Sequence, residues 1–68
     1  MLVGQNIKKI RESKSISLQQ LSDLSGVDHT TLWKIETRDR DARTSTLSKL
    51  ATALNVEESI FYTKNLVI

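Results

Sequence analysis

A short segment near the middle of the chain places hydrogen-bonding side chains on one face of a predicted helix. Leu32 and Ile35 define the buried side of this helix. His29, Thr30 and Lys34 lie on or near the opposite side, because successive residues rotate by about 100° around the axis. A helix that enters the major groove of DNA reads base edges with such side chains. We therefore predict that His29 and Thr30 read bases and that Lys34 reaches a guanine or a phosphate. For His29 the alternative is a solvent-exposed or helix-capping residue.

Two neighbours of these residues have more than one predicted role. Asp28 suits the N-terminal cap of the same helix, where its carboxylate meets the positive end of the helix dipole. Its alternative role is base reading, in which it accepts a hydrogen bond from cytosine N4. Trp33 has three roles open to it: packing on residues 38–43, contact with the sugar-phosphate edge of DNA, or a protein interface.

Phosphate contacts are predicted at the start of the helix that precedes this segment. Free backbone N–H groups and the helix dipole favour an anion there, and Ser17 and Gln19 are placed to assist. Asp39 and Asp41 lie among the arginines of residues 38–43. Because their negative charge weakens the attraction for phosphate, we expect only one or two of these arginines to contact the DNA backbone. The further candidates for backbone contact are Thr31, Trp33, Arg38, Arg40 and Arg43.

The elements that must position these residues are predicted to be helices, since the chain has no proline and only two glycines. A first helix fits residues 3–13, whose apolar side chains repeat at helical spacing. Ser17 and Gln20 form a capping-box pattern that opens a second helix. Gly26 ends that helix, because glycine readily takes a left-handed backbone, and the third helix covers residues 29–37.

The second half of the chain is predicted to close the core with two more helices. Residues 37–44 carry charges without apolar periodicity and should form an exposed loop. A fourth helix then ends near Asn55, and a short fifth helix follows it. The apolar residues that mark them are Leu47, Leu50, Ala51 and Leu54 in the fourth helix and Val56, Ile60 and Phe61 in the fifth. No stretch alternates long enough for a sheet, so the predicted fold class is all-α.

Composition narrows the class of protein. A chain of 68 residues is one small domain that buries roughly 60% of its unfolded surface. With no cysteine and one histidine, disulfides and thiolate or multi-histidine metal sites are excluded, and we expect neither a metal nor a cofactor. No apolar run approaches the ~20 residues of a membrane span, and no signal peptide is present, so we expect a cytoplasmic protein without a membrane partner.

Residues 3–62 contain four stretches at helix-turn-helix spacing: IKKIRE, the small-residue turn at Ser22 and Gly26, WKIE, and LSKLATALNV. Together they resemble the Xre family of bacterial and phage regulators, relatives of the phage Cro and CI repressors. The resemblance implies a compact five-helix, lambda-repressor-like domain that binds operator DNA, usually as a dimer. It also implies an ion pair between Arg11 and Glu36, which partial burial would make costly to break.

Three residues depart from the family pattern. Ser22 stands where alanine is usual, and Ser25 stands where an apolar residue is frequent. Both serines are expected to reduce the apolar packing between the two helices without disrupting the helix-turn-helix motif. Trp33 replaces a small polar residue. The loop over residues 37–44 also lacks the common glycine, so its path is not predicted.

The chain divides into a helix-turn-helix domain over residues 1–62 and an apolar tail over residues 63–68. The tail has no obvious place in a five-helix core, so we expect it to contribute to a homodimer interface. The alternative is a frayed terminus or a tail folded back on the first helix. The candidate interface residues are Ile60, Phe61, Tyr62, Leu66, Val67 and Ile68.

The sequence thus predicts a transcriptional regulator that binds a two-fold symmetric operator in double-stranded DNA as a dimer, more often repressing than activating. The alternative is a protein-interaction module, such as an antitoxin or adaptor, that uses the same helices to bind a protein partner or antagonist. An enzyme is disfavoured for two reasons. Ser25, Asp28 and His29 lie around one turn, but no further residues are placed to orient them for catalysis. The sequence also contains no glycine-rich phosphate loop.

Overall fold

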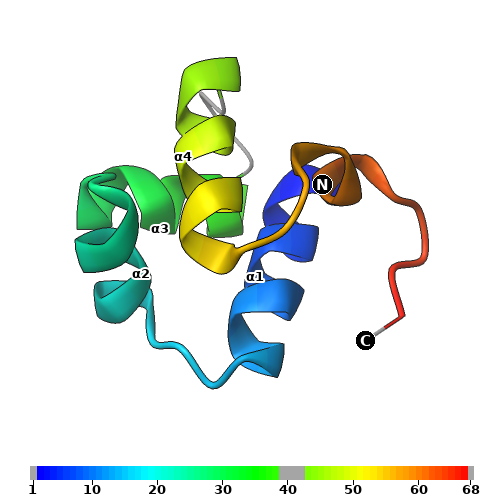
Figure 1. The fold of residues 1–68 in the computed structure, drawn as a ribbon, viewed down its shortest axis with the longest axis horizontal. Coiled ribbons are helices and arrows are strands. Elements are labelled where there is room, and N and C mark those ends of the chain that lie inside the picture. The colour runs from blue at the N-terminus through cyan, green and yellow to red at the C-terminus, as the bar shows by residue number, and fades with distance from the viewer. Residues whose placement is uncertain (1, 39–42, 68) are drawn as a thin grey trace.

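The computed structural model describes residues 2–38 and 43–67, and the fold in these ranges is helical without a strand. The all-α prediction is confirmed. None of the helices in these ranges has the length and apolar character needed to cross a membrane. The elements are α1 (Leu2–Ser13), α2 (Leu18–Ser25), α3 (His29–Arg38), α4 (Thr44–Leu54) and the 3-10 helix η1 (Glu58–Tyr62) (Figure 1).

The predicted short fifth helix is present as η1, which is a 3-10 helix of five residues and not an α-helix. Asn55 takes a left-handed backbone at φ 58°, and the backbone of Glu57 and Thr63 is extended. Only the five residues between Glu57 and Thr63 are therefore left to form a helix. Within it the Ile60 N–H donates to the Glu57 carbonyl at 3.1 Å, three residues back. One short turn provides too few hydrogen bonds to propagate an α-helix.

The helix boundaries follow from capping residues. Ser17 forms the predicted capping box with Gln20, in which each side chain accepts a hydrogen bond from the other residue's backbone N–H. Gly26 caps the end of α2 at φ 76°, and Asn55 caps the end of α4. A Cβ added to Gly26 would meet no heavy atom within 4 Å, so the left-handed backbone, rather than crowding, favours glycine there.

The core brings the apolar sides of all five elements together, and α3 carries two of its completely buried residues. This helix packs against α1 and α2, while α4 packs on α2 and η1 packs on α1 and α4. In Figure 1, α2 and η1 lie at opposite sides of the molecule. The buried apolar residues are Ile7, Ile10, Leu21, Val27, Leu32, Ile35, Leu47, Leu50, Ala51, Leu54 and Phe61.

Asn6 is the buried polar residue of the described core, and it was not among the predicted residues. Its Nδ2 donates to the Phe61 carbonyl at 2.9 Å and to the Thr63 carbonyl at 2.7 Å. These are carbonyls at the end of η1, which a one-turn helix leaves without backbone partners. The signal in the sequence was its position on the apolar face of the first helix, one residue before Ile7.

The segment after η1 runs back along α1, which is the alternative arrangement weighed for the tail. Leu66 packs against the core at its edge, and its carbonyl accepts a hydrogen bond from Lys9 Nζ at 3.4 Å. The Val67 side chain is 91% exposed. Ile68 lies outside the described residues.

Candidate nucleic-acid interface

Serine hydroxyls hold the turn between α2 and α3. Ser22 Oγ donates to the Val27 carbonyl at 2.7 Å, and Ser25 Oγ donates to the Leu21 carbonyl at 2.7 Å. The Val27 N–H in turn donates to Ser25 Oγ at 3.1 Å. The two serines that depart from the family pattern therefore supply hydrogen bonds to the turn. These hydrogen bonds offset the loss of apolar packing that the sequence predicts for them.

Asp28 caps the start of α3, which is the favoured of its two predicted roles. Its Oδ2 accepts hydrogen bonds from the Thr30 N–H at 3.0 Å and from the Thr31 N–H at 3.4 Å. A carboxylate at this end of a helix satisfies free N–H groups and meets the positive end of the dipole. The cap makes His29 the first helical residue and so sets which side chains of the first turn face solvent.

The two sides of α3 differ as the sequence predicts. Leu32 and Ile35 are completely buried. The three predicted base readers of this helix, His29, Thr30 and Lys34, are exposed. Thr31 is half-buried, and Trp33 is 43% exposed. One exposed polar face thus backs onto a fixed apolar face.

An ion pair fixes the C-terminal half of α3, as the family resemblance implies. Arg11 Nε donates to Glu36 Oε2 at 2.8 Å, and Arg11 Nη2 donates to Glu36 Oε1 at 3.0 Å. Only 11% of the Arg11 side chain and 4% of the Glu36 side chain are exposed. The hydrogen bond to Glu36 raises the pKa of Arg11 above its usual value. The two hydrogen bonds make the pair bidentate.

Arg11 also reaches the chain that leads into α2. Its Nη1 donates to the Ile16 carbonyl at 2.8 Å, one residue before the Ser17 cap. One guanidinium thus links α1, the start of α2 and the end of α3. Because both helices of the motif are tied to one residue, their relative position is preserved.

The N-terminus of α2 presents polar groups, as predicted for a phosphate site. Ser17 Oγ accepts the Gln20 N–H at 3.0 Å, which leaves its own O–H free to donate to an anion. Gln19 Nε2 donates to Asp23 Oδ1 at 3.0 Å on the exposed side of the helix. A phosphate contact from Gln19 would replace that hydrogen bond.

The predicted arginines are placed at two helix ends. Arg38 is the last residue of α3, and its Cζ lies 5.4 Å from the centre of the Trp33 ring. Arg43 is the exposed residue that precedes α4, with extended backbone angles. Arg40 lies outside the described residues. Of the roles considered for Trp33, packing on residues 38–43 matches the contact seen, because the ring lies against Arg38, the first residue of that range.

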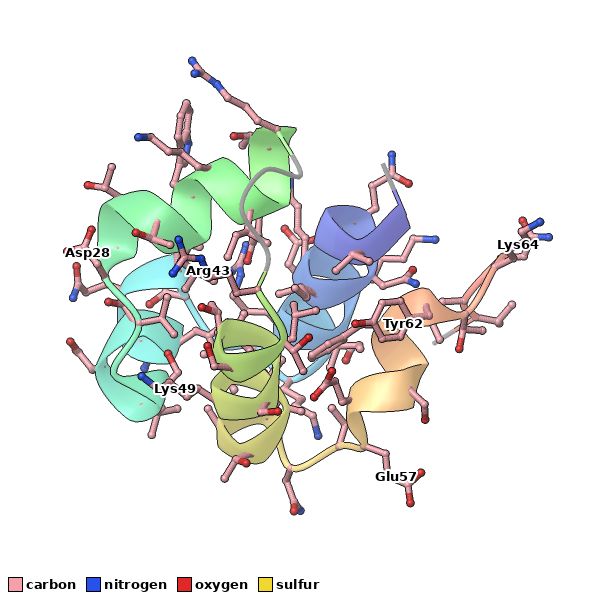
Figure 2. The ribbon with its side chains drawn as sticks, turned by 90° about the horizontal axis from the view of Figure 1, so that it is seen from above. Asp28, Arg43, Lys49, Glu57, Tyr62 and Lys64 are labelled. Atoms are coloured by element: carbon pink, nitrogen blue, oxygen red, sulfur yellow. The ribbon has the colours of Figure 1, made fainter. Side chains whose placement is uncertain are left out.

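The candidate dimer residues lie away from this face. Figure 2 shows Asp28 at the start of α3 on one side of the molecule and Tyr62 with Lys64 on the other. Tyr62 is half-exposed, whereas Ile60 and Leu66 are partly buried against the core. Phe61 is completely buried within the chain, so it offers no surface to a second subunit in this fold.

This arrangement, in which a capped and exposed third helix follows a tight turn, defines a helix-turn-helix protein. The chain belongs to the helix-turn-helix family, whose model matches residues 7–61. The resemblance to Xre-type regulators is thereby confirmed.

Two relatives agree with this family. The chain is 33% identical over 54 residues to the control protein C.SmaI of Serratia marcescens. That alignment covers 79% of the chain and 64% of C.SmaI, so the chain spans less than two thirds of that relative's length. The fold is similar to the crystal structure of the restriction-modification controller protein C.AhdI from Aeromonas hydrophila, with a TM-score of 0.83 and 32% sequence identity. That match covers 87% of this chain and 89% of C.AhdI.

Proposed function

We propose that the protein is a sequence-specific regulator of transcription that binds double-stranded DNA. The observation that carries this proposal is the exposed face of α3, since His29, Thr30 and Lys34 project from a helix whose other side is buried. A recognition helix must be held rigidly for base contacts to discriminate, and the Arg11–Glu36 pair and the turn serines provide that rigidity. Membership of the helix-turn-helix family supports the proposal.

Within this function, His29 and Thr30 are the proposed base readers, and Lys34 contacts a guanine or a phosphate. The N-terminal part of a recognition helix lies nearest the base edges. Threonine can donate, accept, or place its methyl group against thymine. The Asp28 carboxylate already accepts two backbone N–H groups, so its main role is to orient these residues.

Contacts to the DNA backbone are proposed on both sides of the recognition helix. Ser17 and Gln19 lie at the start of α2, Thr31 and Arg38 lie in α3, and Arg43 precedes α4. Such contacts set register and affinity but carry no sequence information. They should make binding strongly dependent on salt, because each neutralised phosphate releases counterions.

The operator is proposed to be two-fold symmetric and bound by a homodimer, which represses by occupying the promoter. One recognition helix reads only a few base pairs, and a dimer would place two of them about 34 Å apart, one turn of DNA. The proposed interface uses Tyr62 and Val67, which are exposed, with Ile60 and Leu66 beside them. Sedimentation of a chain truncated after Tyr62 tests the tail, because unchanged dimerisation would exclude it from the interface.

The names of the two relatives support a more specific proposal, control of restriction-modification genes. C.SmaI is a control protein and C.AhdI is a restriction-modification controller protein, and each is about one third identical to this chain. Binding across the genome of the source organism tests this role. A bound site upstream of such genes would support it, and sites confined to other genes would reject it.

We assign no catalytic role to the residues around the turn. The Ser25 hydroxyl is bonded to the backbone of α2, and the Asp28 carboxylate is occupied as a helix cap. Their polar groups serve the backbone of the helix-turn-helix. The cytoplasm is the proposed location, since the proposed partner is chromosomal, plasmid or phage DNA.

Selection of bound duplexes from a random pool tests sequence-specific binding, repeated with Thr30→Ala and Lys34→Ala. We expect a symmetric site whose preferred bases change with Thr30→Ala, at about 1–3 kcal/mol for one position. Arg43→Ala is the matched control, because loss of a phosphate contact should weaken all sequences alike. If no site is enriched, and a protein partner instead co-purifies at fixed stoichiometry despite competitor DNA, the interaction-module alternative replaces this function.

A further inference from the structure

Trp33 is a large aromatic side chain left partly exposed on the face that the proposed function assigns to DNA. It is 43% exposed, whereas Phe61 is completely buried. Its neighbours in α3 at Leu32 and Ile35 fill the core, so the indole is not needed for packing there. A core role therefore does not account for a tryptophan at this position.

The ring has a specific partner on its own helix. Arg38 Cζ lies 5.4 Å from the ring centre, within the distance at which a cation is attracted to an aromatic face. The Thr37 hydroxyl donates to the Trp33 carbonyl at 2.7 Å, a further hydrogen bond in the last turn of the helix. The contact thus orders a long side chain at the end of the recognition helix.

The kind of contact matters for what Arg38 can still do. A carboxylate would take up the N–H donors of the guanidinium and neutralise its charge, as Glu36 does for Arg11. An aromatic ring carries no net charge, so the contact with Trp33 does not neutralise the guanidinium of Arg38. Within residues 2–38 and 43–67 the ion pair found is that of Arg11 with Glu36, so no described carboxylate neutralises Arg38.

Arg38 lies at the C-terminal end of α3, where a phosphate contact needs a cation. The C-terminal end of a helix carries partial negative charge, which disfavours an anion nearby. A guanidinium held at that end reverses the local field and offers two parallel N–H donors to phosphate oxygens. Ordering the side chain beforehand reduces the conformational entropy lost on binding.

We propose that Trp33 is a positioning residue, which holds the Arg38 guanidinium at the end of α3 with its donors free to bind a DNA phosphate. This proposal rests on the proposed DNA binding, and it assigns Trp33 no contact with bases. The clamp formed by Trp33 and Arg38 acts on the backbone, so it should operate on any duplex.

The test is a double-mutant cycle on two fluorescently labelled duplexes, the site enriched by selection and a duplex of mixed sequence. Trp33→Leu should weaken binding to both by about two- to fivefold, and Trp33→Phe should retain most of the affinity. Arg38→Gln should weaken binding and reduce the salt slope by about one. In the Arg38→Gln background, Trp33→Leu should have no further effect. Lys64→Gln is the charge-matched control, since Figure 2 shows Lys64 across the molecule from Asp28, which precedes α3.

A second measurement needs no DNA. Trp33 is the single tryptophan of the chain, so its fluorescence emission reports this contact directly. Arg38→Gln should change the emission of the free protein, and Lys64→Gln should not. Identical emission in the two variants would show that the clamp is absent in solution and would overturn the proposal.

The outcomes separate this inference from the function beneath it. Equal losses from Trp33→Leu in the two Arg38 backgrounds would mean that Trp33 contacts DNA itself, and the positioning role would be wrong. No loss in the wild-type background would also overturn it. A clamp effect on the mixed-sequence duplex without any selected site would retain the clamp and reject sequence-specific recognition. No binding to either duplex would reject both.

Discussion

The turn between α2 and α3 and the segment around η1 are held by contacts of different kinds. In the turn, Ser22, Ser25 and Gly26 make hydrogen bonds within a few residues of sequence. Around η1, Asn6 reaches across more than fifty residues of sequence to two carbonyls. The difference shows that local bonds shape the turn of the proposed DNA-binding motif, whereas a distant side-chain amide, together with the buried Phe61, holds the end of the domain.

Breaking the ion pair behind α3 should have the largest effect on stability. Glu36→Ala leaves the Arg11 guanidinium without its partner in a partly buried position, and we expect a loss of about 3 kcal/mol in the free energy of unfolding. Urea unfolding followed by circular dichroism measures it. The double variant Arg11→Met with Glu36→Leu should lose less than Glu36→Ala alone, because no charge is left unpaired. Equal losses in the two variants would contradict this account.

Removing the distant amide should have the next largest effect, confined to the other region. Asn6→Ala takes away the donor to the Phe61 and Thr63 carbonyls, and we expect a loss of about 2 kcal/mol. Asn6→Asp is the matched variant, since a carboxylate of the same shape brings acceptors toward carbonyl oxygens and should lose more.

Amide hydrogen exchange separates the two regions in the Asn6 variants. The Thr63 amide, which donates to the Ile60 carbonyl, should exchange faster, while the amides of α3 keep their protection relative to global unfolding. A matching increase along α3 would mean that the two regions open together. The comparison between them would then fail.

The sequence predicted local features more reliably than long-range ones. The capping box at Ser17, the glycine turn and the end of α4 at Asn55 were found because each depends on a few neighbouring residues. The role of Asn6 was missed, since its partners lie far along the chain. The type of η1 was also missed, because apolar spacing alone does not distinguish one 3-10 turn from a short α-helix.

The candidate site shows the same division. Exposure of His29, Thr30 and Lys34 followed from helical rotation relative to Leu32 and Ile35. The Arg11–Glu36 pair was expected from the family resemblance, and the structure contains it. The position of Arg38 against Trp33 depends on side-chain conformations, so the sequence left three roles for Trp33 open.

A substitution in the turn should have a smaller effect, with a cause that can be isolated. Gly26→Ala places a Cβ in open space but on a left-handed backbone, so we expect a loss of about 1 kcal/mol from conformation alone. Gly26→Asn should lose less, because asparagine tolerates this backbone better than alanine. Thermal unfolding of the two variants measures the difference. If asparagine costs more than alanine, space rather than backbone angle limits the position.

The contact that joins the tail to α1 should matter least. Lys9 Nζ donates to the Leu66 carbonyl at 3.4 Å in an exposed setting, where water can replace either partner. We expect Lys9→Gln to change the free energy of unfolding by less than about 0.5 kcal/mol. Leu66→Ala should cost more, since Leu66 packs against the core and its burial, rather than the lysine, holds the tail. Urea unfolding of the two variants in parallel decides between these causes, and a larger loss from Lys9→Gln would assign the tail's position to the hydrogen bond.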